Sequence, residues 1–174
     1  MPRQRRGKPA SKAIFTAMLE PHVIYEDKNF VALDKPAGLL VHPTPRSHEP
    51  TLVDWILRHY PEVREVGEDT KFRPGIVHRL DKGTSGVILI PRREEYFKYL
   101  KNLFSRREIH KTYLAVVFGE PIEKEGVIDK PLGIKPGTTL RTVRGGKMPK
   151  EARTEDKVRK VLRGTENTRA GGET

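Results

Sequence analysis

The feature that most constrains this chain is a polar, glycine-rich turn between two short apolar segments. The apolar segments, residues 75–77 and 87–90, predict two short strands. The turn between them holds a single carboxylate, Asp81, close to His78 and Arg79. Side chains on a turn at the end of a strand are fixed by a rigid scaffold and stay within reach of a substrate. The stretch therefore predicts a candidate functional site around Asp81.

The residues before this turn predict a hairpin followed by a helix. Apolar residues 23–25 and 30–33 flank a four-residue polar turn, which is typical of a hairpin. Thr51 and Asp54 have the spacing of a capping box, so a helix is expected to begin there. Pro61 is expected to end that helix. Residues 61–74 then predict a charged loop.

The second half of the chain predicts one more helix and further strands. Residues 94–106 have helical apolar spacing, and residues 111–118 are apolar on both faces, as in a central strand. Residues 126–128 predict a short strand, and the segment 152–162 predicts the start of the next one. No regular alternation of strands and helices occurs. The expected fold class is therefore α+β, with a mixed, largely antiparallel sheet and flanking helices.

Composition restricts the function classes. The 174 residues include 34 basic and 23 acidic ones, a formal charge of +11, which favours an anionic partner such as nucleic acid over a merely solvated surface. The chain has no cysteine, which excludes thiol catalysis, disulfides and cysteine-based zinc sites. It also lacks an apolar run of about 18 residues that could span a membrane. A cytoplasmic monomer is expected.

The expected organisation is one domain with polar ends. Residues 1–20 form a basic arm, residues 21–163 the folded domain, and residues 164–174 a tail without a core-forming pattern, which we expect to be disordered.

Several side chains have simpler interpretations that compete with a site. An aspartate in a glycine-rich turn often only hydrogen-bonds its own backbone, and Tyr113 in an apolar strand is usually part of a core. Lys35 is expected to shape a turn or to contact a phosphate. The histidines His42, His48 and His78 have no zinc-ligand spacing, so no metal is predicted.

Three segments together resemble the RluA-type RNA pseudouridine synthases. Residues 30–43 (FVALDKPAGLLVHP) are similar to the first motif of that family. Residues 74–81 (PGIVHRLD), followed by 84–86 (TSG), are similar to the second. Residues 111–119 (KTYLAVVFG) are similar to the strand that carries its active-site tyrosine. The order and spacing of three motifs are far more specific than any one of them.

The resemblance implies a role for each site residue. Asp81 corresponds to the essential aspartate, which either attacks the sugar or abstracts a ribose proton; both chemistries remain open. Arg79 is similar to the arginine that fills the space of a flipped-out nucleotide, and Tyr113 to the tyrosine that stacks on the target base. His78 is expected to contact the substrate beside them. The implied reaction converts uridine to pseudouridine in ribosomal or transfer RNA and requires no cofactor.

The resemblance ends before the end of the chain. Family members continue with a third motif that supplies a basic partner for the aspartate, and nothing after Ala152 is similar to it. The sequence thus predicts an incomplete catalytic domain. The alternative function is an RNA-binding remnant with impaired catalysis.

Overall fold

The structure is a computed structural model that describes residues 19–44, 49–138 and 140–162. Apart from residues 19 and 20, the predicted basic arm lies outside the described residues, as does the predicted tail. Contacts divide the chain into two compact units, residues 1–112 and 113–174, and each is described by itself. The single domain expected over residues 21–163 stays a prediction.

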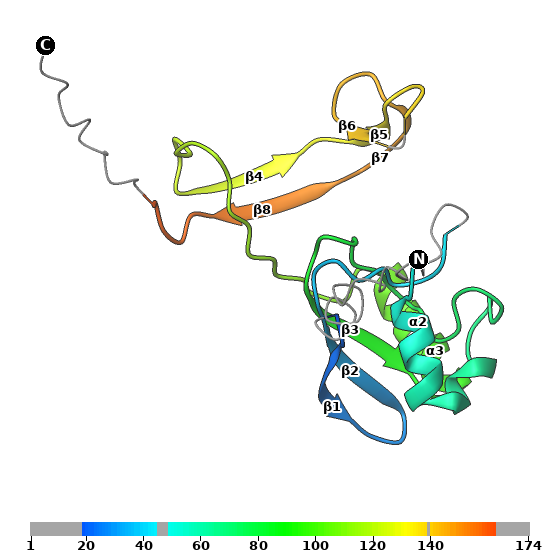
Figure 1. Ribbon diagram of the computed structural model, residues 1–174. Coiled ribbons are helices and arrows are strands. Elements are labelled where there is room, and N and C mark those ends of the chain that lie inside the picture. Colours follow the sequence, from blue (N-terminus) through cyan, green and yellow to red (C-terminus); the bar gives the residue numbers. More distant parts are fainter. Residues whose placement is uncertain (1–18, 45–48, 139, 163–174) are drawn as a thin grey trace, which may run out of the picture. The chain divides into compact units, whose positions relative to one another are not determined.

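The first unit is built on a three-stranded antiparallel sheet in the order β1-β2-β3 (Figure 1). Its strands are β1 (His22–Glu26), β2 (Phe30–Lys35) and β3 (Gly86–Pro91). The predicted hairpin and the predicted strand at residues 87–90 are therefore confirmed. The Asp27 carboxylate closes the hairpin turn, because it accepts hydrogen bonds from the backbone N–H groups of Asn29 (2.7 Å) and Phe30 (2.9 Å).

Two helices cover one face of this sheet (Figure 1). They are α2 (Leu52–His59) and α3 (Glu94–Ser105), so both predicted helices are confirmed. The capping box is formed: the N–H of Asp54 donates to Thr51 Oγ1 (3.3 Å), and the N–H of Thr51 donates to the Asp54 carboxylate (2.8 Å). Pro61 opens a 3-10 helix (Pro61–Glu65) in the segment expected to be a charged loop.

The core lies between the sheet and these helices. Strand β2 contributes Val31 and Leu33 to it, and β3 contributes Ile88 and Ile90; all four are fully buried. Side chains alternate across a strand, so the next inward position on β2 belongs to Lys35, which is also fully buried. A charged residue thus ends the core-facing row of β2.

The strand predicted at residues 75–77 is wrong. This segment is a turn: Gly75 has a φ of +68°, and the N–H of Ile76 donates to the Arg73 carbonyl (3.2 Å). A Cβ at position 75 would lie 2.5 Å from a methyl group of Val63, so the backbone passes too close to the core for any side chain. The apolar residues here pack as a loop instead of pairing as a strand.

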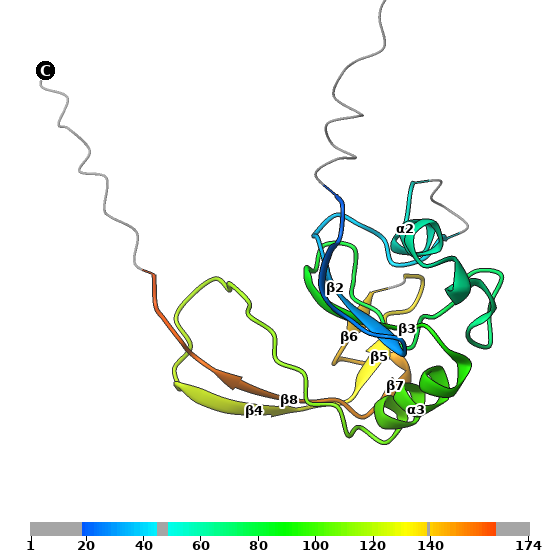
Figure 2. The same ribbon diagram turned by 90° about the horizontal axis from the view of Figure 1, so that it is seen from below.

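The second unit contains two small antiparallel sheets (Figure 2). Strand β4 (Glu125–Asp129) pairs with β8 (Arg153–Lys157). Strand β5 (Leu132–Ile134) lies between β6 (Arg141–Thr142) and β7 (Lys147–Lys150). The strand predicted at residues 126–128 is confirmed, and the one predicted within 152–162 forms but ends at Lys157. The α+β class, with antiparallel strand pairs, is confirmed.

The central strand predicted for residues 111–118 is wrong. All eight residues are exposed, and Phe118 is fully so. Within the described ranges no strand pairs with this segment. An apolar run needs a hydrogen-bonded neighbour to become a strand, and the sequence pattern alone does not supply one.

None of the helices in the described ranges has the length and apolar composition that crossing a bilayer requires.

Candidate active site

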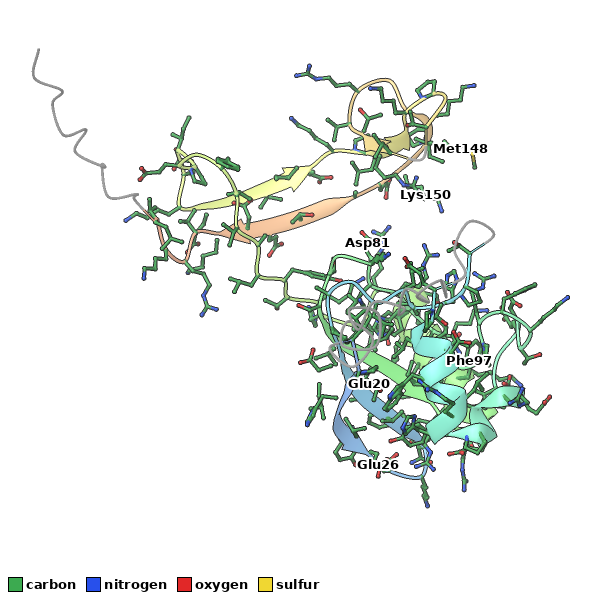
Figure 3. The ribbon with its side chains drawn as sticks, viewed as in Figure 1. Glu20, Glu26, Asp81, Phe97, Met148 and Lys150 are labelled. Atoms are coloured by element: carbon green, nitrogen blue, oxygen red, sulfur yellow. The ribbon has the colours of Figure 1, made fainter. Side chains whose placement is uncertain are left out.

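Asp81 lies on the loop that leads into β3, at the end of the sheet opposite the β1–β2 turn (Figure 3). The loop is turned tightly, because the N–H of Thr84 donates to the Asp81 carbonyl (3.0 Å). The Asp81 side chain is exposed, and among the described residues no group donates a hydrogen bond to its carboxylate. The carboxylate is thus free to meet a ligand.

The buried ammonium of Lys35 fastens this loop to the sheet. Its Nζ donates to the carbonyls of Pro36 (2.9 Å), Leu39 (2.9 Å) and Lys82 (3.5 Å). The Lys82 carbonyl also accepts from the N–H of Gly38 (2.7 Å). Burial lowers the pKa of Lys35, and the negative charge of Asp81 opposes that shift. Lys35 therefore joins the first sequence motif to the loop of Asp81.

The role of Lys35 was missed by sequence reasoning, which assigned it to a turn or a phosphate contact. The available signal was the alternation Val31, Leu33, Lys35, which places the lysine on the core face of its strand. A fully buried lysine holding three carbonyls cannot contact a phosphate in this conformation.

Arg79 contacts a histidine of the first motif. Its Nη1 donates to Nε2 of His42 (3.1 Å), and Nδ1 of His42 donates to the carbonyl of Pro43 (2.9 Å). Arg79 and Asp81 lie on a segment that is not a strand, so the alternation of side chains along a strand does not place them on one face. In the described chain Arg79 makes no ion pair with Asp81. Within the described residues, Lys35 interacts electrostatically with Asp81.

His78 has a structural contact. Its Nε2 accepts a hydrogen bond from the N–H of Leu89 on β3 (2.9 Å), and its ring stacks on Phe104 of α3 at 4.6 Å. Burial, with the positive charge of Lys111 as a smaller cause, lowers the pKa of His78 to about 4. The neutral ring thus covers a backbone donor at the outer edge of β3. Substrate contact by His78 stays a prediction.

This contact makes the stability depend on pH. His78 has a lowered pKa when folded, so its contribution is complete above about 6.5 and is lost as the pH falls toward 4. We expect the free energy of unfolding to drop by up to about 3 kcal/mol across this window from His78 alone. Urea unfolding at a series of pH values measures the drop, and His78→Phe should flatten it.

The exposed histidine His110 provides the control, because His110→Phe should keep the wild-type slope. Hydrogen bonds lower the pKa values of Asp27 and Asp69 below 3.8. These carboxylates therefore change the stability only at a pH below the range in which His78 does. An unchanged slope in His78→Phe would show that the ring is not held in its neutral form.

A shallow pocket of about 350 Å³ adjoins the segment that carries His78 and Arg79. Its other walls come from the loop around Asp69 and from Phe97 of α3. Two ion pairs lie on its walls, Arg73 with Asp69 (2.9 Å) and Lys101 with Glu68. The charged groups on this pocket are thus largely paired with one another, and Asp81 is not part of the lining.

The structure brings together three of the four predicted site residues, His78, Arg79 and Asp81, on one loop. Tyr113 is the first residue of the second unit and is 60% exposed, so its place in the site stays a prediction. The described residues contain no cluster of histidine and acidic side chains that could hold a metal ion. His48, one of the three histidines considered for zinc, lies outside the described residues.

Comparisons with known proteins agree with these motifs. The sequence model of the family "RNA pseudouridylate synthase" matches residues 29–171. Ribosomal large subunit pseudouridine synthase D of Nitrosomonas europaea is 38% identical over 78% of this chain, and 38% of that relative is covered. An uncharacterized RNA pseudouridine synthase of Chloroflexus aurantiacus is 44% identical over 62% of this chain and is covered over 33% of its length.

Comparison with solved structures finds pseudouridylate synthase domains of similar fold. The solved structure titled "Human RNA Pseudouridylate Synthase Domain Containing 1" superimposes with a TM-score of 0.61 at 19% identity, covering 79% of this chain and 51% of that one. The chain belongs to the RNA pseudouridine synthase family, in its RluA-type branch. It spans between a third and two fifths of the length of the two curated relatives described above.

Proposed function

We propose that this chain takes part in isomerising uridine to pseudouridine in RNA, with Asp81 as the catalytic residue. The observation that supports this most is the exposed Asp81 carboxylate on a loop to which the buried Lys35 donates hydrogen bonds. An exposed carboxylate on a loop held by hydrogen bonds is suited to act on a bound sugar. Membership of the family supports RNA uridine as the substrate.

The reaction needs a base outside the helical stack. The bond between N1 and C1′ breaks, the uracil turns, and a bond between C5 and C1′ forms, while C5 loses a proton and N1 gains one. These steps require the base to leave its stacked position. Arg79 lies two residues from Asp81, and its guanidinium plane suits the vacated space. Tyr113 is proposed to stack on the displaced uracil.

The direct test is to incubate the chain with ribosomal or transfer RNA and to detect pseudouridine chemically or by mass spectrometry. New pseudouridine at a defined position supports the proposal. RNA binding without any pseudouridine would favour the alternative, an RNA-binding remnant. The proposal places the protein in the cytoplasm with its RNA, and the expected monomer is checked by light scattering.

The net charge gives a second expected result. A +11 chain that contacts RNA phosphates releases counterions on binding. For about five phosphate contacts, affinity should fall on the order of 10²-fold between about 50 and 200 mM salt. Fluorescence anisotropy with a labelled stem-loop measures this slope. An affinity that does not change with salt would mean that the basic side chains do not meet the RNA backbone.

A further inference from the structure

The contact between His42 and Arg79 depends on one form of the imidazole. The carbonyl of Pro43 can only accept, so Nδ1 of His42 must carry the proton in the 2.9 Å hydrogen bond. Nε2 of a neutral ring is then unprotonated and can accept from Arg79 Nη1 at 3.1 Å. Both bonds exist together only in the neutral ring with its proton on Nδ1.

We propose that His42 is a positioning residue for Arg79, holding its guanidinium in place before RNA binds. This inference rests on the proposed function, in which Arg79 enters the space left by the uridine. Arginine is a long side chain with many rotamers, and fixing it costs conformational entropy. A guanidinium already held by His42 loses less freedom when RNA binds. His42 thus acts through Arg79 and does not need to touch the RNA.

The same contact is sensitive to pH. A protonated imidazole donates from both nitrogens and cannot accept from an arginine, so protonation of His42 releases Arg79. Among the described residues, the charged groups that interact with His42 are Arg79 and Asp69, and Asp69 is itself paired with Arg73 (2.9 Å). Arginine stays charged, and hydrogen bonding lowers the pKa of Asp69 below 3.8. The contact between His42 and Arg79 therefore depends on an unprotonated Nε2.

A double-mutant cycle on the full chain tests the proposal, with RNA affinity and turnover as separate readouts. His42→Ala should weaken binding of a uridine-containing stem-loop by about two- to tenfold, the cost of ordering one long side chain. In the background of Arg79→Ala, the same His42→Ala change should have no further effect. Losses that add in the double variant would overturn the proposal, because His42 would then act independently of Arg79.

The pH profile separates positioning from a general structural role. His42→Gln keeps an acceptor within reach of Arg79 but cannot take up a proton, so it should bind like the wild type at neutral pH and keep that affinity as the pH is lowered. Protonation of His42 should lower the affinity of the wild type toward that of His42→Ala as the pH falls, and the exposed control His110→Gln should follow the wild type. Equal pH profiles for the wild type and His42→Gln would contradict the proposal.

A third measurement does not depend on RNA. A long-range ¹H–¹⁵N correlation spectrum of the free protein at neutral pH should show His42 with its proton on Nδ1, assigned by loss of the signal in His42→Gln. A proton on Nε2 would overturn the positioning contact. If this spectrum and the binding cycle agree with the proposal but no RNA yields pseudouridine, the proposed reaction fails while the pairing of His42 with Arg79 stands.

Discussion

Asp81→Asn should lower the rate of pseudouridine formation by at least about 10³-fold, because it removes the carboxylate that is proposed to act on the ribose. The substitution keeps the shape of the side chain. Asp81 is exposed and makes no hydrogen bond through its carboxylate within the described residues, so folding should be unaffected. RNA affinity should stay within about threefold of the wild type, since the carboxylate has no attraction for phosphate. Mass spectrometry measures the rate of pseudouridine formation, and fluorescence anisotropy measures the RNA affinity.

The matched control for this change is Glu95→Gln, which neutralises another exposed carboxylate of the first unit, on α3. It should leave turnover unchanged. Normal turnover in Asp81→Asn would show that another group performs the chemistry. A large loss of RNA affinity in the same variant would assign Asp81 to binding.

Lys35→Met should destabilise the first unit and slow the reaction together. Methionine keeps the apolar stem but removes the donor, which leaves the carbonyls of Pro36 and Leu39 without their 2.9 Å partner. One buried and one part-buried carbonyl left without this donor cost on the order of 3 kcal/mol. The carbonyl of Lys82 keeps its bond from Gly38, so the loop should loosen without detaching. Urea unfolding measures the loss of stability.

The kinetic effect of Lys35→Met should be in kcat. Lys35 is fully buried and cannot touch the RNA, so affinity should change little, while a displacement of the Asp81 carboxylate by about 1 Å can cost about 10²-fold in rate. Lys98→Met is the control, because this lysine on α3 is exposed and its loss should change stability by no more than about 0.5 kcal/mol. Wild-type stability and kcat in Lys35→Met would show that the loop of Asp81 is held by other contacts.

The parts of the fold that could be predicted from sequence are those specified by neighbouring residues. The β1–β2 hairpin follows from its polar turn, in which Asp27 closes its own backbone. Helix α2 follows from the capping box of Thr51 and Asp54. In both cases the groups that stabilise the element lie within a few positions of each other, so the pattern contains the physical cause.

The predictions that failed concern segments whose conformation depends on residues far away in the sequence. Residues 111–118 have the composition of a central strand, but pairing is decided by a neighbour that composition does not describe. Residues 75–77 look like a strand, yet Gly75 has a φ of +68° and leaves no room for a Cβ beside Val63, so the segment is a turn. The short strands β5, β6 and β7 were not predicted, because segments of two to four residues are too short to show a periodic pattern.

The candidate site shows the same division. Asp81 and Arg79 were found because a family motif contains them, whereas their supports, Lys35 and His42, come from a motif some 40 positions earlier. The contact of Arg79 with His42 spans 37 positions, and that of Lys82 with Lys35 spans 47. Sequence spacing does not reveal contacts of this length.

The double anchoring of the Lys82 carbonyl, by Lys35 Nζ and the N–H of Gly38, has a consequence for protein engineering. A graft of residues 74–86 alone onto a new scaffold would transfer the Asp81 carboxylate without Lys35 and Gly38, which hold its loop in position. The part that must be transferred consists of two separate segments. The segment that contains Lys35 and Gly38 has to be grafted together with the loop, in antiparallel register with Lys35 opposite Gly86. A graft that preserves both pieces and their pairing would retain the geometry of the site, whereas swapping either piece between relatives alone would not.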